Sequence, residues 1–195
     1  EMVGLTVIAL VVFIIAAAQL NTLALILAPV AAAYLILYPF TKRFTWAANL
    51  LLGWALAISP SAAWIGVTGS LPLQPVMLSL AVALWAGSFD ILYHTQDEGF
   101  HLKEGLHSVA SRFGIVNAFR IARTLDTLAV TVLVVLGIWM GLNWPYFVGC
   151  VGAVGFLLYK YSLVNPGDLS RMGLAFARIN AYISTTMLVG TLIAI

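Results

Sequence analysis

The stretch that decides the fold is residues 72–93, PLQPVMLSLAVALWAGSFDILY, which carries one charged side chain, Asp90, close to its end. About 20 predominantly apolar residues are needed to cross a bilayer as an α-helix. The stretch is too long for a membrane barrel strand and lacks the alternation of one. Because backbone polar groups in lipid must be satisfied within the segment, residues 72–93 predict a transmembrane helix.

The rest of the chain repeats this pattern. Of its 195 residues, 63% are hydrophobic and 8% are charged, and the mean hydropathy is +1.05. Soluble domains carry about 25% charged residues, so a soluble protein is excluded, and a net charge of +2 does not suggest nucleic-acid binding. The apolar runs lie at about 3–18, 22–40, 46–68, 72–93, 124–142, 145–161 and 173–195. We therefore predict an all-α integral membrane protein with seven transmembrane helices.

The basic residues indicate which loops share a side of the membrane. All nine lie in or beside the breaks after the second, fourth and sixth runs: Lys42, Arg43, Lys103, Arg112, Arg120, Arg123, Lys160, Arg171 and Arg178. Basic loops stay in the cytoplasm. These three breaks are therefore predicted to face the cytoplasm, or the matrix in a mitochondrion, with residue 1 inside and residue 195 outside.

Polar residues concentrate in two segments on that predicted face. Residues 90–126 contain nine of the 16 charged residues and all three histidines, and residues 38–45 contain Lys42 and Arg43. Ionisable groups at a membrane edge are costly unless they are paired, hydrated or used. Asp90 and Asp97, one to two helical turns apart, are therefore candidate functional carboxylates.

Carboxylates grouped with basic residues can bind an anionic ligand through Mg²⁺, which prefers one or two carboxylates, several waters and substrate phosphates. Lys42 and Arg43 would then contact phosphate oxygens directly, the arginine in bidentate fashion. The alternative for Lys42 and Arg43 is a topological anchor. The alternative for Asp90 is a helix-terminal or interhelical hydrogen-bonding residue.

Two of these stretches carry a family resemblance. Residues 38–45, YPFTKRFT, and residues 90–97, DILYHTQD, resemble two signatures of the UbiA superfamily of intramembrane aromatic prenyltransferases. Residues 105–114 and 162–180 continue the likeness, which covers essentially the whole chain. The resemblance implies one transmembrane prenyltransferase domain over residues 1–195, corresponding to helices three to nine of a nine-helix bundle.

The same resemblance implies that residues before Glu1 would hold two further helices and the family's first aspartate-rich motif. The chain as given would then be an N-terminally truncated fragment, and one alternative is that it is inactive by itself. The implied location is the bacterial cytoplasmic membrane, or the mitochondrial inner membrane in a eukaryote, with the site facing the cytoplasm.

For the metal, the resemblance implies that Asp97 is a Mg²⁺ ligand and that Asp90 is a second ligand or an orienting neighbour. His101 stands where the family usually has an aspartate, and histidine is a poor ligand for Mg²⁺. The implied reaction is Mg²⁺-assisted loss of diphosphate from a polyprenyl diphosphate, followed by attack of an aromatic carbon. The implied acceptor is 4-hydroxybenzoate or a dihydroxynaphthoate, as in ubiquinone or menaquinone synthesis.

For the substrates, the resemblance implies that Lys42 and Arg43 hold the diphosphate, with Lys103 as a further candidate. Tyr38 and Tyr93 would border the allyl group, where aromatic rings can stabilise a cation. Within this scheme, the lipid bilayer is the only other partner expected.

Two other functions compete with this interpretation. A transporter or channel would line a path with charges, but a path across the bilayer should leave polar residues near the centre of several helices. A zinc hydrolase would use His94, His101 and His107, although a lone pair of histidines seven residues apart is weak support for a metal site.

Overall fold

The computed structural model describes residues 2–97, 99 and 104–195. Its α-helices are α1 (Met2–Leu20), α2 (Thr22–Leu37), α3 (Ala48–Thr68), α4 (Leu73–Tyr93), α6 (Val109–Phe113), α7 (Ile115–Trp139), α8 (Trp144–Leu163), α9 (Met172–Leu174) and α10 (Asn180–Ala194). A 3₁₀ helix, Tyr38–Arg43, follows α2, and a π-helical turn, Ala175–Ile179, joins α9 to α10. The predicted all-α membrane architecture is confirmed.

Six of these helical segments are long and apolar enough to cross a membrane: Val3–Leu20, Thr22–Arg43, Ala48–Thr68, Leu73–Tyr93, Ile115–Trp139 and Trp144–Leu163. The seventh predicted run is helical from Met172 to Ala194, but the π-helical turn interrupts it. Because a π turn shifts the hydrogen-bonding pattern from i→i+4 to i→i+5, the uninterrupted α-helix there has only 15 residues.

Helix α7 begins at Ile115, well before the predicted residue 124. Its first turns are amphipathic, because Ala118, Phe119 and Ala122 are buried while Arg120 is exposed. Because these turns contain polar residues as well as apolar ones, hydropathy alone does not assign them to the apolar run. The helix therefore extends out of the apolar layer into the polar end of the molecule.

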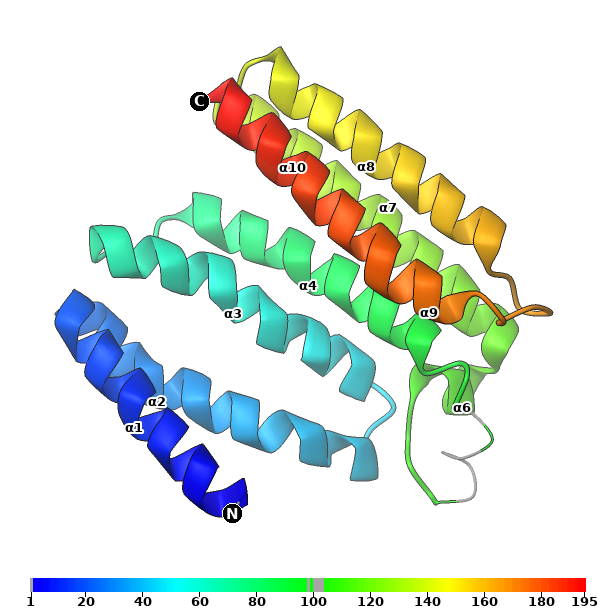
Figure 1. Ribbon diagram of the computed structural model, residues 1–195, viewed down its shortest axis with the longest axis horizontal. Coiled ribbons are helices and arrows are strands. Elements are labelled where there is room, and N and C mark those ends of the chain that lie inside the picture. Colours follow the sequence, from blue (N-terminus) through cyan, green and yellow to red (C-terminus); the bar gives the residue numbers. More distant parts are fainter. Residues whose placement is uncertain (1, 98, 100–103) are drawn as a thin grey trace.

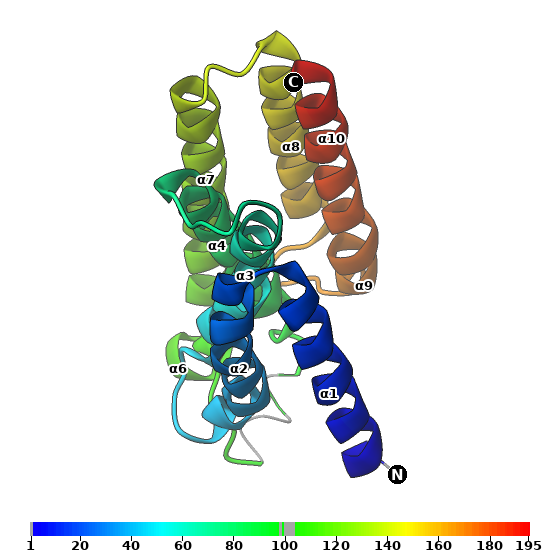
Figure 2. The ribbon, with the colours of Figure 1, turned by 90° about the vertical axis from the view of Figure 1, so that its left-hand side faces the viewer.

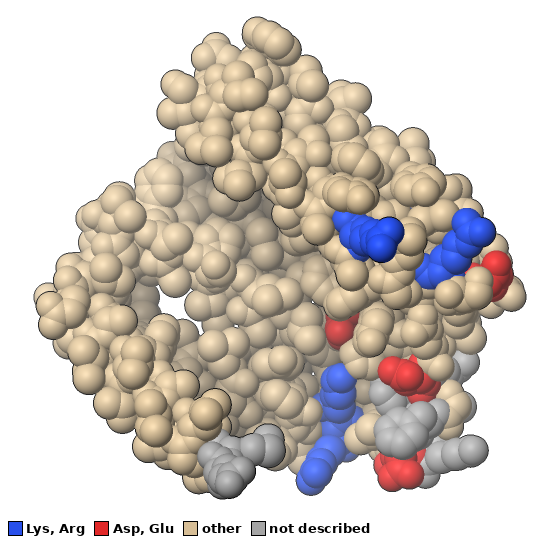
Figure 3. Space-filling view, in the orientation of Figure 1, with Lys and Arg blue, Asp and Glu red and all other residues tan. Residues whose placement is uncertain are grey.

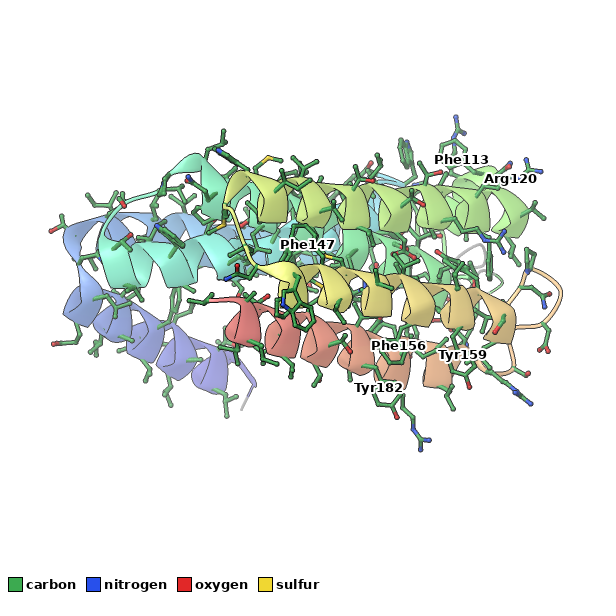
Figure 4. The ribbon with its side chains drawn as sticks, turned by 90° about the horizontal axis from the view of Figure 1, so that it is seen from above. Phe113, Arg120, Phe147, Phe156, Tyr159 and Tyr182 are labelled. Carbon is green, nitrogen blue, oxygen red and sulfur yellow. The ribbon has the colours of Figure 1, made fainter. Side chains whose placement is uncertain are left out.

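The helices lie side by side in three groups (Figure 1). The α1–α2 pair lies on one side, α3 and α4 lie in the middle, and α7, α8 and α10 lie on the other side. The closest packing is between α3 and α4, α4 and α7, and α8 and α10. Figure 4 shows Phe156 of α8 beside Tyr182 of α10, with ring centroids 5.5 Å apart.

One glycine sets the approach of α3 to α4. A Cβ on Gly53 would lie 2.3 Å from the carbonyl oxygen of Ala83 and 2.8 Å from the amide nitrogen of Gly87. Both distances are too short for any side chain, so this crossing requires glycine. The close approach allows side chains about one turn away, Asn49 on α3 and Asp90 on α4, to touch.

The two ends of the molecule differ in polarity. The C-terminus and the loop between α7 and α8 lie at one end, and the N-terminus and α6 lie at the other (Figure 2). On the face drawn in Figure 3, the charged side chains gather toward the end that carries α6, and the rest of that face is uncharged. This arrangement fits the predicted clustering of basic loops on one side.

Candidate active site

The candidate site lies at the polar end, where α2, α3, α4 and the segment before α6 converge. The 3₁₀ helix after α2 presents Lys42, whose carbonyl oxygen accepts a hydrogen bond from the amide of His107 at 2.8 Å. Pro39 lies in the first turn of this 3₁₀ helix, where a missing N–H costs nothing. The backbone contact thus ties the two polar segments together, although they are distant in sequence.

Four side chains form a continuous chain of contacts that we call the Lys42 network: Lys42, His94, Asp90 and Asn49. The Lys42 Nζ lies 2.7 Å from the His94 Nε2. The His94 Nδ1 lies 2.9 Å from the Asp90 carbonyl oxygen and 3.2 Å from the Asp90 Oδ1. The Asn49 Nδ2 donates to the Asp90 Oδ2 at 2.8 Å and lies 3.3 Å from the His94 Nδ1.

The network is anchored at its inner end and open at its outer end. The Asn49 Oδ1 accepts a hydrogen bond from the amide of Val109 at 3.0 Å, which connects the network to the start of α6. Asn49, Asp90 and His94 are buried, whereas Lys42 is half-buried. The lysine is therefore the member that a ligand at the membrane surface can reach.

His94 follows the last residue of α4 and receives opposing influences from its neighbours. Burial lowers the pKa of His94, but hydrogen bonds to Asp90 and the charge of Asp90 raise it by more, so the pKa lies above its ordinary value. The Lys42 ammonium opposes this shift. The tautomer that satisfies both contacts carries its proton on Nδ1, donates it to Asp90 and accepts from Lys42 at Nε2.

Asp97, the other predicted carboxylate, lies in the turn that follows α4. Its side chain is exposed, and its amide donates to the His94 carbonyl oxygen at 3.2 Å. Within residues 2–97, 99 and 104–195, no three His, Cys, Asp or Glu side chains come together as a metal-binding group. The predicted residues Lys103 and His101 lie outside the described residues.

The two predicted aromatic residues, Tyr38 and Tyr93, contact different partners. The half-buried Tyr38 stacks on Tyr34, with ring centroids 6.5 Å apart. Tyr93 packs against Phe176 of the π-helical turn at 4.5 Å and edge-on to His94 at 6.0 Å. Phe176 in turn meets Phe89 at 5.3 Å. Sequence reasoning did not single out Phe176, because its partners lie on a distant helix.

Tyr93, Phe176 and Phe89 form an aromatic cluster, and an apolar cavity lies deeper in the molecule. It has a volume of about 900 Å³ and runs along α4, α7 and α10, from Asp126 to Ile195. A second cavity of about 520 Å³ is lined by Phe89 and Phe176, and both cavities share Trp85 on their walls. The aromatic cluster therefore lies between the Lys42 network and the apolar interior.

A second buried ionic cluster, the Asp126 cluster, consists of Asp126, Lys160 and Tyr161. The Lys160 Nζ lies 2.5 Å from the Asp126 Oδ2, and the Tyr161 hydroxyl donates to the same oxygen at 2.7 Å. Lys160 is 1% exposed and Asp126 is 2% exposed. The two charges neutralise each other inside the α7–α8 pair. Sequence reasoning missed this pair, because its members are 34 residues apart.

The zinc interpretation finds no support in the described geometry. Both ring nitrogens of His94 contact Asp90 or Lys42, and a zinc-bound histidine must give one nitrogen to the metal. His107 contributes its backbone amide to the site.

Comparison with known proteins identifies a matching family. The UbiA prenyltransferase family matches residues 1–184. A 4-hydroxybenzoate octaprenyltransferase of Alcanivorax borkumensis is 35% identical over 130 residues, which cover 67% of this chain and 44% of that protein. A protein of the same name from Escherichia fergusonii is 32% identical over 172 residues, covering 88% of this chain and 58% of that protein. The chain thus spans about half the length of these curated relatives.

The fold has a solved counterpart. The apo structure of a UbiA homolog from Aeropyrum pernix K1 superposes with a TM-score of 0.81 at 22% sequence identity, covering 92% of this chain and 68% of that chain. This match independently supports the helical arrangement.

Proposed function

Because this chain belongs to the UbiA prenyltransferase family, we propose that the protein transfers a polyprenyl group from its diphosphate to a hydroxylated aromatic acid. The acceptor would be 4-hydroxybenzoate or a dihydroxynaphthoate, and the names of the relatives favour the former. The observation that carries the proposal is the placement of Lys42 at the polar end of the molecule, where His94 connects it to Tyr93 and Phe176, and Phe176 lines the smaller apolar cavity.

The basic residues suit the diphosphate end of such a substrate. An ammonium group has three donors, and the contact of Lys42 with His94 uses one of them. Arg43 is exposed beside it and can offer a planar pair of donors to phosphate oxygens. Together the two residues would hold a leaving group that is highly charged.

The carboxylates suit Mg²⁺ bound mainly through substrate and water. Asp97 is exposed and would be the protein ligand. Asp90 is buried and already contacts Asn49 and His94, so it fits the role of an orienting neighbour better. Mg²⁺ commonly uses one or two carboxylates and substrate phosphates. When bound, the ion would supply neutralisation of the charge that develops on the departing diphosphate.

The apolar parts of the site suit the prenyl group. The cavity of about 900 Å³ would accommodate the hydrocarbon chain. Tyr93, with Phe176 behind it, would border the allylic carbon, and Tyr38 would approach from the 3₁₀ helix. Aromatic faces stabilise cations, and an apolar surround keeps water from quenching the allylic cation before the aromatic carbon attacks it.

We place the protein in the bacterial cytoplasmic membrane with this site facing the cytoplasm, because basic residues follow the positive-inside rule. A reporter fused after Ser108 should read cytoplasmic, and a reporter fused at Asn143 should read external. The reverse pattern would overturn this orientation.

The proposed activity is tested with the full protein reconstituted in liposomes. Radiolabelled prenyl diphosphates of several lengths are supplied with 4-hydroxybenzoate, with a dihydroxynaphthoate or with neither, in the presence and absence of Mg²⁺. We expect a prenylated aromatic product with one acceptor, dependent on Mg²⁺. Arg43→Ala should remove most of the activity, and Arg120→Ala, an exposed arginine on α7, serves as the control. If neither acceptor gives a prenylated product with any chain length of prenyl diphosphate, the proposed function is rejected.

A further inference from the structure

The described site contains a histidine whose two ring nitrogens face groups of opposite charge. His94 lies between the buried carboxylate of Asp90 and the half-buried ammonium of Lys42, at 3.2 Å and 2.7 Å respectively. A lysine next to a carboxylate ordinarily forms a direct ion pair, as Lys160 does with Asp126 at 2.5 Å. At the candidate site, an imidazole separates the two charges.

We propose that His94 is a positioning residue that holds the Lys42 ammonium for a diphosphate ligand while keeping it out of a direct ion pair with Asp90. The inference rests on the proposed function only in taking Lys42 as a diphosphate-binding group. His94 itself does not touch the substrate in this arrangement. It acts through Lys42.

The geometry explains how His94 orients the lysine. In the tautomer that is protonated at Nδ1, the Asp90 carboxylate and carbonyl oxygens accept from the Nδ1–H, which orients the ring plane. The Nε2 lone pair is then aimed at the Lys42 Nζ and accepts one of its three protons. Two N–H groups stay available to phosphate oxygens. A flexible lysine held in this way loses less conformational freedom when the ligand binds.

The inner part of the network keeps the imidazole in place. The Asn49 Nδ2 donates to the Asp90 Oδ2, and the Asn49 Oδ1 holds the amide of Val109. Asn49 reaches Asp90 because the Gly53 crossing brings α3 against α4. The position of Lys42 is therefore determined by a rigid helix pair rather than by the 3₁₀ helix alone.

Two substitutions of His94 separate its two contacts. His94→Gln places a carbonyl oxygen near the position of Nε2, so it keeps an acceptor for Lys42 and loses the donor to Asp90. His94→Asn places an amide nitrogen near the position of Nδ1, so it keeps the donor to Asp90 and loses the acceptor for Lys42. His94→Phe removes both contacts.

The test measures binding of inorganic pyrophosphate, with and without Mg²⁺, to the full protein in detergent by calorimetry. Without an acceptor at this position, Lys42 must be ordered when the ligand binds, so His94→Phe and His94→Asn should weaken pyrophosphate binding about tenfold or more. The pyrophosphate affinity of His94→Gln should stay within about threefold of the wild-type affinity. Kinetically, the same order should be seen in the KM for prenyl diphosphate, with little change in the KM for the aromatic acid.

A second measurement guards against a merely structural effect. In a Lys42→Met background, His94→Phe should cause no further loss of pyrophosphate affinity, because the group that it positions is gone. An additive loss would overturn the inference, and so would a His94→Asn protein that binds like wild type. Wild-type protein without affinity for pyrophosphate would also overturn it. If pyrophosphate binding follows the expected order but no prenyl transfer is found, the proposed function fails and the role of His94 stands.

Discussion

The Asp126 cluster and the Lys42 network combine a lysine and a carboxylate in different ways. In the Asp126 cluster, the lysine and the carboxylate touch directly at 2.5 Å, and both are almost fully buried. In the Lys42 network, His94 stands between them, and the lysine is half-buried at the polar end. In a direct ion pair, the carboxylate neutralises the charge of the lysine. A separated pair leaves that charge available to an anionic ligand.

The largest expected effect comes from breaking the direct pair. Lys160→Met would leave the Asp126 carboxylate buried without a counter-ion, which costs about 3–5 kcal/mol. We expect a correspondingly lower stability against SDS unfolding in mixed micelles. Replacing both partners, as in Asp126→Leu with Lys160→Met, should recover most of this loss, because an apolar pair can replace a buried ion pair. If the single variant is as stable as wild type, the pair is not structural.

Removing Asp97 should produce the opposite pattern. Asp97 is exposed, so Asp97→Ala should leave stability and membrane insertion unchanged. Loss of an electrostatic group that acts on developing charge typically costs about 10²–10³ in kcat. We expect at least that loss of prenyl transfer, measured by product formation at saturating Mg²⁺. Full activity in this variant would exclude Asp97 as the metal ligand.

The sequence was sufficient to predict the parts of the structure that depend on local composition. The apolar runs placed the membrane helices, and Lys42 and Asp90 were recognised from their position at run ends. Hydropathy does not detect the amphipathic start of α7 at Ile115 or the π-helical turn Ala175–Ile179. Both depend on packing against other helices.

The contacts of the site were less predictable for the same reason. Asn49 is a single polar residue near the start of an apolar run, and nothing in its neighbourhood indicates that it meets Asp90, 41 residues away. His94 was considered only as a possible zinc ligand, although its partner Lys42 is 52 residues distant. The helix crossing at Gly53 decides the encounter of Asn49 with Asp90, and a crossing angle cannot be read from one sequence.

A smaller effect is expected for Arg43→Lys, which separates a diphosphate ligand from a topological anchor. An anchor needs only positive charge, whereas a bidentate contact requires the planar guanidinium. We expect kcat/KM for prenyl diphosphate to fall by an amount equivalent to about 1–3 kcal/mol of transition-state stabilisation. The KM for the aromatic acid should change less. Arg120→Lys is the matched control. Wild-type kinetics in Arg43→Lys would return this residue to the anchor role.

The smallest effect is expected for Tyr161→Phe, which removes one donor from the Asp126 cluster and leaves its ion pair intact. The Tyr161 hydroxyl donates to the same carboxylate oxygen that Lys160 contacts. Since the charge stays paired, the loss should be about 1 kcal/mol of stability, the ordinary net value of a hydrogen bond. Pyrophosphate affinity and the KM for prenyl diphosphate should not change, because Lys42 is held by His94 and not by this cluster. A change in either quantity without a loss of stability would show that the two clusters are coupled, and the contrast between a structural pair and a ligand-ready lysine would have to be abandoned.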